Sequence, residues 1–77
     1  MNSKLDYGLL HCDDRGIFYA ELMYDNNQWG EIVLCSDSQK TTVTMWDCNF
    51  TVSTNDLMEM LNKASTHLIE FEASKKD

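Results

Sequence analysis

Several metal-binding side chains occur in this chain, but their spacing does not match a known metal site. The candidate ligands with soft donor atoms are His11, Cys12, Cys35, Cys48 and His67. Structural zinc sites usually begin with two ligands about two to four residues apart. Only His11 and Cys12 are neighbours, and adjacent residues of a strand point to opposite faces of a sheet. We therefore expect no metal and no cofactor, with the cysteines packed as small apolar side chains.

Residues 25–31 share part of the pattern of a calcium-binding loop. Asp25 and Gly30 occupy the first and sixth positions of such a loop. However, Trp29 stands at the fifth position, and Ser36 stands where the loop needs its bidentate glutamate. We interpret this segment as a turn.

Signatures of covalent catalysis and of phosphate binding are missing from the sequence. Gly8, Gly16 and Gly30 are too scattered to form a phosphate-binding loop. Asp13 and Asp14 precede a glycine, which is more typical of a solvated turn than of a catalytic carboxylate pair. A chain of 77 residues also has little room for a substrate pocket. We predict that the protein is not an enzyme, and a metal-dependent or thiol enzyme is the least favoured alternative.

The charge balance is strongly acidic. Thirteen Asp and Glu oppose six Lys and Arg, for a net charge of -7. Over residues 1–73 the net charge is -8, with twelve acids against four bases. Such a chain repels nucleic acid and anionic membranes and attracts basic surfaces. Three widely spaced cysteines, an odd number, favour reduced thiols and predict a cytoplasmic protein.

Alternating apolar residues and polar turns predict four strands. The expected strands cover residues 5–12, 17–25, 29–36 and 41–52, and each is followed closely by the next. Consecutive hairpins of this kind favour an antiparallel meander. In the last strand, alternation would place four residues on one face, namely Trp46, Cys48, Phe50 and Val52.

A helix is predicted over residues 54–72. Ser53 is a good N-cap residue, and Asp56 follows it three positions later. An apolar stripe then recurs at helical spacing, formed by Leu57, Leu61, Ala64, Leu68 and Phe71. The expected fold class is α+β: a four-stranded antiparallel meander sheet with one C-terminal helix packed across one face. Residues 1–73 are expected to form one domain, and residues 74–77 a frayed tail.

One helix cannot cover all the apolar residues of such a sheet. A second sheet face is expected to carry Tyr7, Tyr19, Trp29, Val43 and Met45. An apolar patch bordered by acidic residues is a plausible docking surface for another protein. The function hypothesis is therefore a small acidic, non-enzymatic protein-binding module without a direct role in nucleic-acid or membrane binding.

In its most specific form, the hypothesis is an inhibitor of the phage, mobile-element or immunity type. Such an inhibitor would occupy the basic, nucleic-acid-binding site of a partner protein. The candidate partner-binding residues are Asp13, Asp14, Glu21, Asp25, Trp29, Glu31, Asp37, Met45 and Asp47. The alternative is a structural adaptor or homodimeric subunit that docks through an apolar sheet face.

Overall fold

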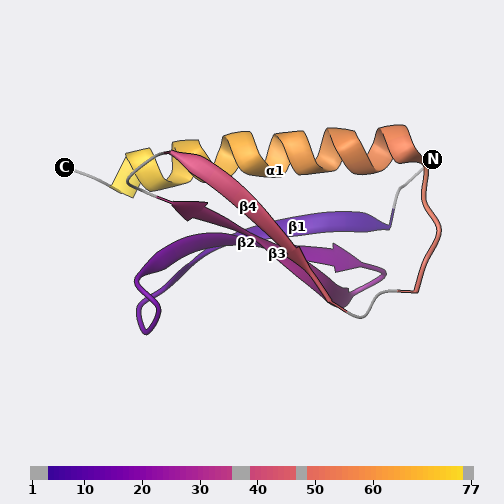
Figure 1. Ribbon diagram of the computed structural model, residues 1–77, viewed down its shortest axis with the longest axis horizontal. Coiled ribbons are helices and arrows are strands. Elements are labelled where there is room, and N and C mark those ends of the chain that lie inside the picture. The colour runs from indigo at the N-terminus through magenta and orange to yellow at the C-terminus, as the bar shows by residue number, and fades with distance from the viewer. Residues whose placement is uncertain (1–3, 36–38, 47–48, 76–77) are drawn as a thin grey trace.

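The computed structural model describes residues 4–35, 39–46 and 49–75. Its elements are, in order, β1 (Leu5–Cys12), β2 (Ile17–Tyr24), β3 (Asn27–Cys35), β4 (Lys40–Met45) and α1 (Thr54–Lys75). The strands form one antiparallel sheet in the order β1-β2-β3-β4. The helix α1 lies across one face of this sheet (Figure 1). The predicted α+β class and ββββα order are confirmed.

The hairpin between β2 and β3 is tighter than expected. Asp25 and Asn26 both have left-handed backbone angles, with φ of 52° and 69°. Two consecutive residues of this kind form the two-residue turn that matches the twist of a hairpin, and Asp and Asn tolerate it best after glycine. Asn27 therefore pairs directly with Tyr24 and begins β3, two residues earlier than predicted.

A β-bulge brings Trp29 into the core. Leu22 pairs with Gly30 whereas Met23 pairs with Gln28, so Trp29 is the extra residue on β3. Such an insertion interrupts the alternation of side chains. Trp29 is only 3% exposed and belongs to the main apolar cluster. The expectation that Trp29 lies on an exposed second face is therefore wrong.

The fourth strand is shorter than predicted. It ends at Met45, and residues 49–53 are not in a strand. Phe50 instead lies over the core, where its ring stacks on Tyr24 at 4.3 Å and contacts Trp29 at 5.5 Å. The chain must leave the sheet here to reach the start of α1, as Figure 1 shows. Cys48 of the predicted one-sided set lies outside the described residues.

The helix begins as predicted and ends later. The Ser53 hydroxyl accepts a hydrogen bond from the Asp56 amide at 3.3 Å, which confirms the N-cap. The helix continues to Lys75, three residues beyond the predicted end at residue 72. Near this end, the Ser74 hydroxyl donates to the Phe71 carbonyl at 2.8 Å.

The buried stripe of α1 is centred slightly differently from the predicted one. Its buried residues are Met60, Ala64, Leu68 and Glu72, at a constant spacing of four. Leu57, Leu61 and Phe71 are half-buried at its edges. On the sheet, the stripe meets Ala20, Leu22, Ile32 and Leu34. Ala64 and Leu68 belong to both stripes, but Met60 and Glu72 are buried where Leu61 and Phe71 were expected. Glu72 is therefore only 2% exposed.

The helix leaves much of the sheet uncovered. It packs mainly on β1, β2 and β3. On β4, Thr41 lies 3.5 Å from Ser65 of the helix, measured between the hydroxyl oxygens. Farther along β4, Val43 and Met45 are 45% and 59% exposed. They are on the helix side of the sheet, because they pair with Ile32 and Gly30.

Gly30 allows β3 and β4 to approach closely, and this predicts a stability change. A Cβ at Gly30 would lie 2.5 Å from the Thr44 carbonyl oxygen, whereas a Cβ at Gly8 would have no neighbour closer than 3.9 Å. We expect Gly30→Ala to lower the free energy of unfolding by about 2 kcal/mol. Gly8→Ala, the matched control, should change it by less than about 0.5 kcal/mol. Urea denaturation followed by circular dichroism measures both, and equal effects would contradict the close approach.

Candidate binding surface

The sheet face opposite α1 is not covered by the helix. Core residues of the strands, such as Leu9, Leu22 and Ile32, point toward the helix. Because side chains alternate along a strand, their neighbours point away from it. We call this surface the far face; it carries Asp6, Gly8, Leu10, Cys12, Ile17, Tyr19, Glu21, Met23, Glu31, Val33, Thr42 and Thr44.

Two carboxylates lie side by side on the far face. Glu21 of β2 and Glu31 of β3 are direct cross-strand partners. Asp6 lies on the neighbouring strand, opposite Met23. Like charges directly opposite each other destabilise a sheet. The pair Glu21 and Glu31 therefore needs compensation or serves a purpose other than stability.

Arg15 compensates one of these charges. From the turn between β1 and β2 it donates two hydrogen bonds to Glu31, at 3.2 and 2.9 Å. Hydrogen bonding to Glu31 raises the pKa of Arg15, so the guanidinium stays charged. The Arg15 guanidinium carbon also lies 5.9 Å from the centre of the Tyr19 ring. Among the described residues, Glu21 has no ion-pair partner.

An apolar row lies beside the carboxylates. Leu10 pairs with Tyr19, and Tyr19 pairs with Val33, so the three side chains cross the far face together. Leu10 is 38% exposed, and the other two are half-buried. An apolar strip bordered by charge is the usual composition of a protein-binding surface.

The acidic turn residues are not part of the same cluster. Asp13 and Asp14 are exposed at the turn before β2, and Asp25 is exposed at the turn after it. A strand of this length separates these turns by about 25 Å. Asp13 contacts the His11 ring at 2.9 Å, and Asp25 lies 3.9 Å from Lys4. Of the proposed acids that lie on different elements and within the described residues, only Glu21 and Glu31 are brought together.

The other proposed residues lie elsewhere. Trp29 is buried and cannot form part of an exposed surface. Met45 is exposed on β4 but on the helix side of the sheet, away from the carboxylates. Asp37 and Asp47 lie outside the described residues. Sequence reasoning missed Asp6 and Leu10, which the alternation of the first strand could have placed on the far face.

The remaining candidates for chemistry are dispersed. The Tyr7 hydroxyl hydrogen-bonds to the His67 ring, and Cys12 is a free thiol. Within residues 4–35, 39–46 and 49–75, no three His, Cys, Asp or Glu side chains gather as metal ligands would.

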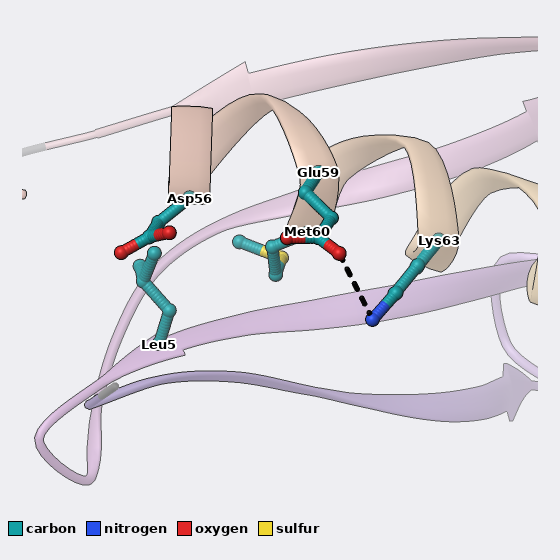
Figure 2. A pocket seen from close by; sticks show the side chains of 5 residues that line it. All are labelled: Leu5, Asp56, Glu59, Met60 and Lys63. Carbon is teal, nitrogen blue, oxygen red and sulfur yellow. Dashed lines mark ion pairs between the residues drawn. The ribbon is translucent and has the colours of Figure 1, made fainter. Parts of the chain in front are cut away.

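A small pocket lies between the start of α1 and β1. Figure 2 shows that it is lined by Leu5, Asp56, Glu59, Met60 and Lys63. Glu59 and Lys63 form an ion pair at 3.4 Å across one helical turn. Because both of these side chains are largely solvent-exposed, the pair is screened by water. The pocket combines one surface ion pair with two apolar side chains, and it has no nucleophile beside a base.

Comparison with known proteins leaves the family open. The sequence matches no protein-family model, and neither the curated proteins nor the solved structures give a significant match. In the part of the chain that the structure describes, no helix has the length and apolar character needed to cross a membrane.

The two tryptophans should differ in their accessibility to solvent. Trp29 is 3% exposed and Trp46 is 43% exposed. We expect Trp46→Phe to leave a fluorescence that acrylamide quenches several-fold less efficiently than free tryptophan, because only buried Trp29 then emits. Adding urea should restore efficient quenching. Efficient quenching of the folded Trp46→Phe protein would contradict the buried position of Trp29.

Proposed function

We propose that this protein is a non-enzymatic protein-binding module whose far face binds a basic surface of a partner protein. The observation that carries the proposal is an uncovered sheet face on which Glu21 and Glu31 are direct neighbours. A module of this kind needs only a complementary surface, and the far face offers both charge and apolar area.

The energetic cost of the carboxylate pair supports a binding role. Two like charges at directly opposed positions lower stability by up to about 1 kcal/mol relative to neutral residues. Arg15 offsets part of this cost at Glu31, but it leaves Glu21 as an uncompensated charge among the described residues. A basic side chain of a partner would find a carboxylate already placed beside an apolar strip. Complementary charge of this kind raises the rate and the specificity of association.

The net charge of -7 supports a partner with a strongly basic site. Proteins that handle nucleic acids have such sites, since they bind phosphates with Lys and Arg. The chain would then act as an inhibitor that competes with the nucleic acid. The free thiol of Cys12 fits a reducing, cytoplasmic compartment.

A homodimeric subunit or adaptor is the second candidate. The exposed apolar side chains of β4, at Val43 and Met45, favour it. This candidate uses a different part of the sheet, and both functions are compatible in one molecule.

The proposal predicts that partner binding depends on far-face charge and on salt. Proteins retained from a cell extract by the immobilised chain should elute as the salt concentration rises past about 0.1 M. At that concentration, charges more than about 10 Å apart are largely screened. Asp6→Asn with Glu21→Gln should weaken retention by about tenfold, because both charges are removed from the far face. The ion pair between Arg15 and Glu31 stays in place in this double variant.

The control makes the same change of net charge on α1. Glu59→Gln with Glu70→Gln alters two exposed helix residues and should leave retention unchanged. Binding that ignores salt, or that responds equally to both double variants, would contradict a role for the far face.

A further inference from the structure

The fourth strand is an open edge of the sheet. It is the last strand in the order β1-β2-β3-β4, and α1 packs mainly on the other three. Val43 is 45% exposed, Met45 is 59% exposed, and Trp46 just beyond the strand is 43% exposed. In Figure 1, β4 begins beside α1 and then runs away from it. The apolar side chains thus lie beside a strand edge with which no other described strand pairs.

This edge lacks the features that usually prevent strands from pairing. Natural edge strands carry charges, prolines or bulges that keep other strands away. β4 contains no proline, its register against β3 is regular, and its one charged residue is Lys40 at its start. By contrast, β1 at the other edge carries Asp6 and Gly8.

The hydrogen-bond pattern determines which backbone groups face outward. The Trp46 amide donates to the Trp29 carbonyl at 3.0 Å, so this residue pair is hydrogen-bonded. Antiparallel ladders alternate bonded and non-bonded pairs. Thr42 and Thr44 therefore also direct their backbone groups toward β3. The amides and carbonyls of Thr41, Val43 and Met45 point away from the sheet.

We propose that a second copy of this chain pairs with this edge, with β4 antiparallel to β4 and a two-fold axis at Val43. If the axis is perpendicular to the sheet, both helices lie on the same side of the joined sheet. Residues that oppose each other across the axis must then belong to the same face. The outward-facing groups of Val43 then bond to those of Val43 in the second copy. Thr41 opposes Met45, Thr42 opposes Thr44, and Lys40 opposes Trp46 of the second copy.

Charge favours a second copy at this position. β1, β2 and β3 each contain an acidic residue, whereas β4 contains none. Two chains with a net charge of -7 repel each other, and β4 is the strand along which they meet without opposed acids. The register also places Lys40 against an exposed indole, a favourable contact between a cation and an aromatic ring. Pairs of threonines and of β-branched residues stabilise cross-strand contacts further.

Pairing in this way would produce one continuous eight-stranded sheet. Both helices would cover the same side, and the two far faces would adjoin on the other. The inference develops the second candidate function and does not depend on a basic partner. Two adjoining far faces would nevertheless give a partner with two basic sites a bivalent surface.

Sedimentation equilibrium across a concentration series tests the proposal. The wild-type chain should approach twice its monomer mass of 8.9 kDa as its concentration rises toward about 1 mM. Val43→Lys should weaken dimerisation by more than about tenfold, because it places two like charges opposite each other. Met58→Lys adds the same charge at another exposed apolar residue and should leave the dimer intact.

Three outcomes would overturn the proposal. They are a wild-type chain that stays monomeric throughout, a dimer that Val43→Lys does not weaken, and a dimer that both variants weaken equally. Circular dichroism establishes that each variant is folded. Salt separates this proposal from the far-face proposal, since screening should strengthen pairing of two acidic chains but weaken binding to a basic partner.

Discussion

Coverage of a four-stranded sheet by a single helix is the constraint on which the rest of this structure depends. A helix is about 10 Å wide with its side chains. Four strands spaced about 4.8 Å apart span more than that width on each face. The helix α1 therefore packs mainly on β1, β2 and β3 and buries one central stripe. The far face and the edge at β4 are direct consequences, and both are surfaces on which other molecules can act.

The bulge at Trp29 shows how the core is completed where the helix begins. Regular alternation would have turned this large side chain away from α1, and a thin core would have lost its largest member. The extra residue in β3 returns Trp29 to the helix side, where it meets Phe50 from the segment after β4. Gly30 beside it allows the β4 backbone to come close. One local irregularity thus connects strand pairing, the core and the path of the chain toward α1.

Much of the fold could be predicted from sequence because its signals are local. Turn residues, alternation and the Ser53 cap define β1, β2 and the start of α1 within a few residues. The bulge at Trp29 and the early end of β4 could not be predicted, because they accompany contacts of Phe50 with Tyr24 and Trp29, which are distant from it in sequence. The candidate site was predicted less well. Counting acids identified Glu21 and Glu31, but only the strand register shows that they are neighbours and that Asp13 and Asp25 are far apart.

Pairing of β4 with a second copy is tested most directly by residue-specific amide hydrogen exchange along β4, measured by NMR at low and high protein concentration. The amides of Thr42 and Thr44 should be protected at both concentrations, because they face β3. The amides of Val43 and Met45 should exchange rapidly in dilute protein and become protected as concentration rises. Protection of Val43 in dilute protein would mean that the chain covers its own edge. Rapid exchange at high concentration would mean that no second copy pairs there, and either result would contradict an open edge at β4 that pairs with a second copy.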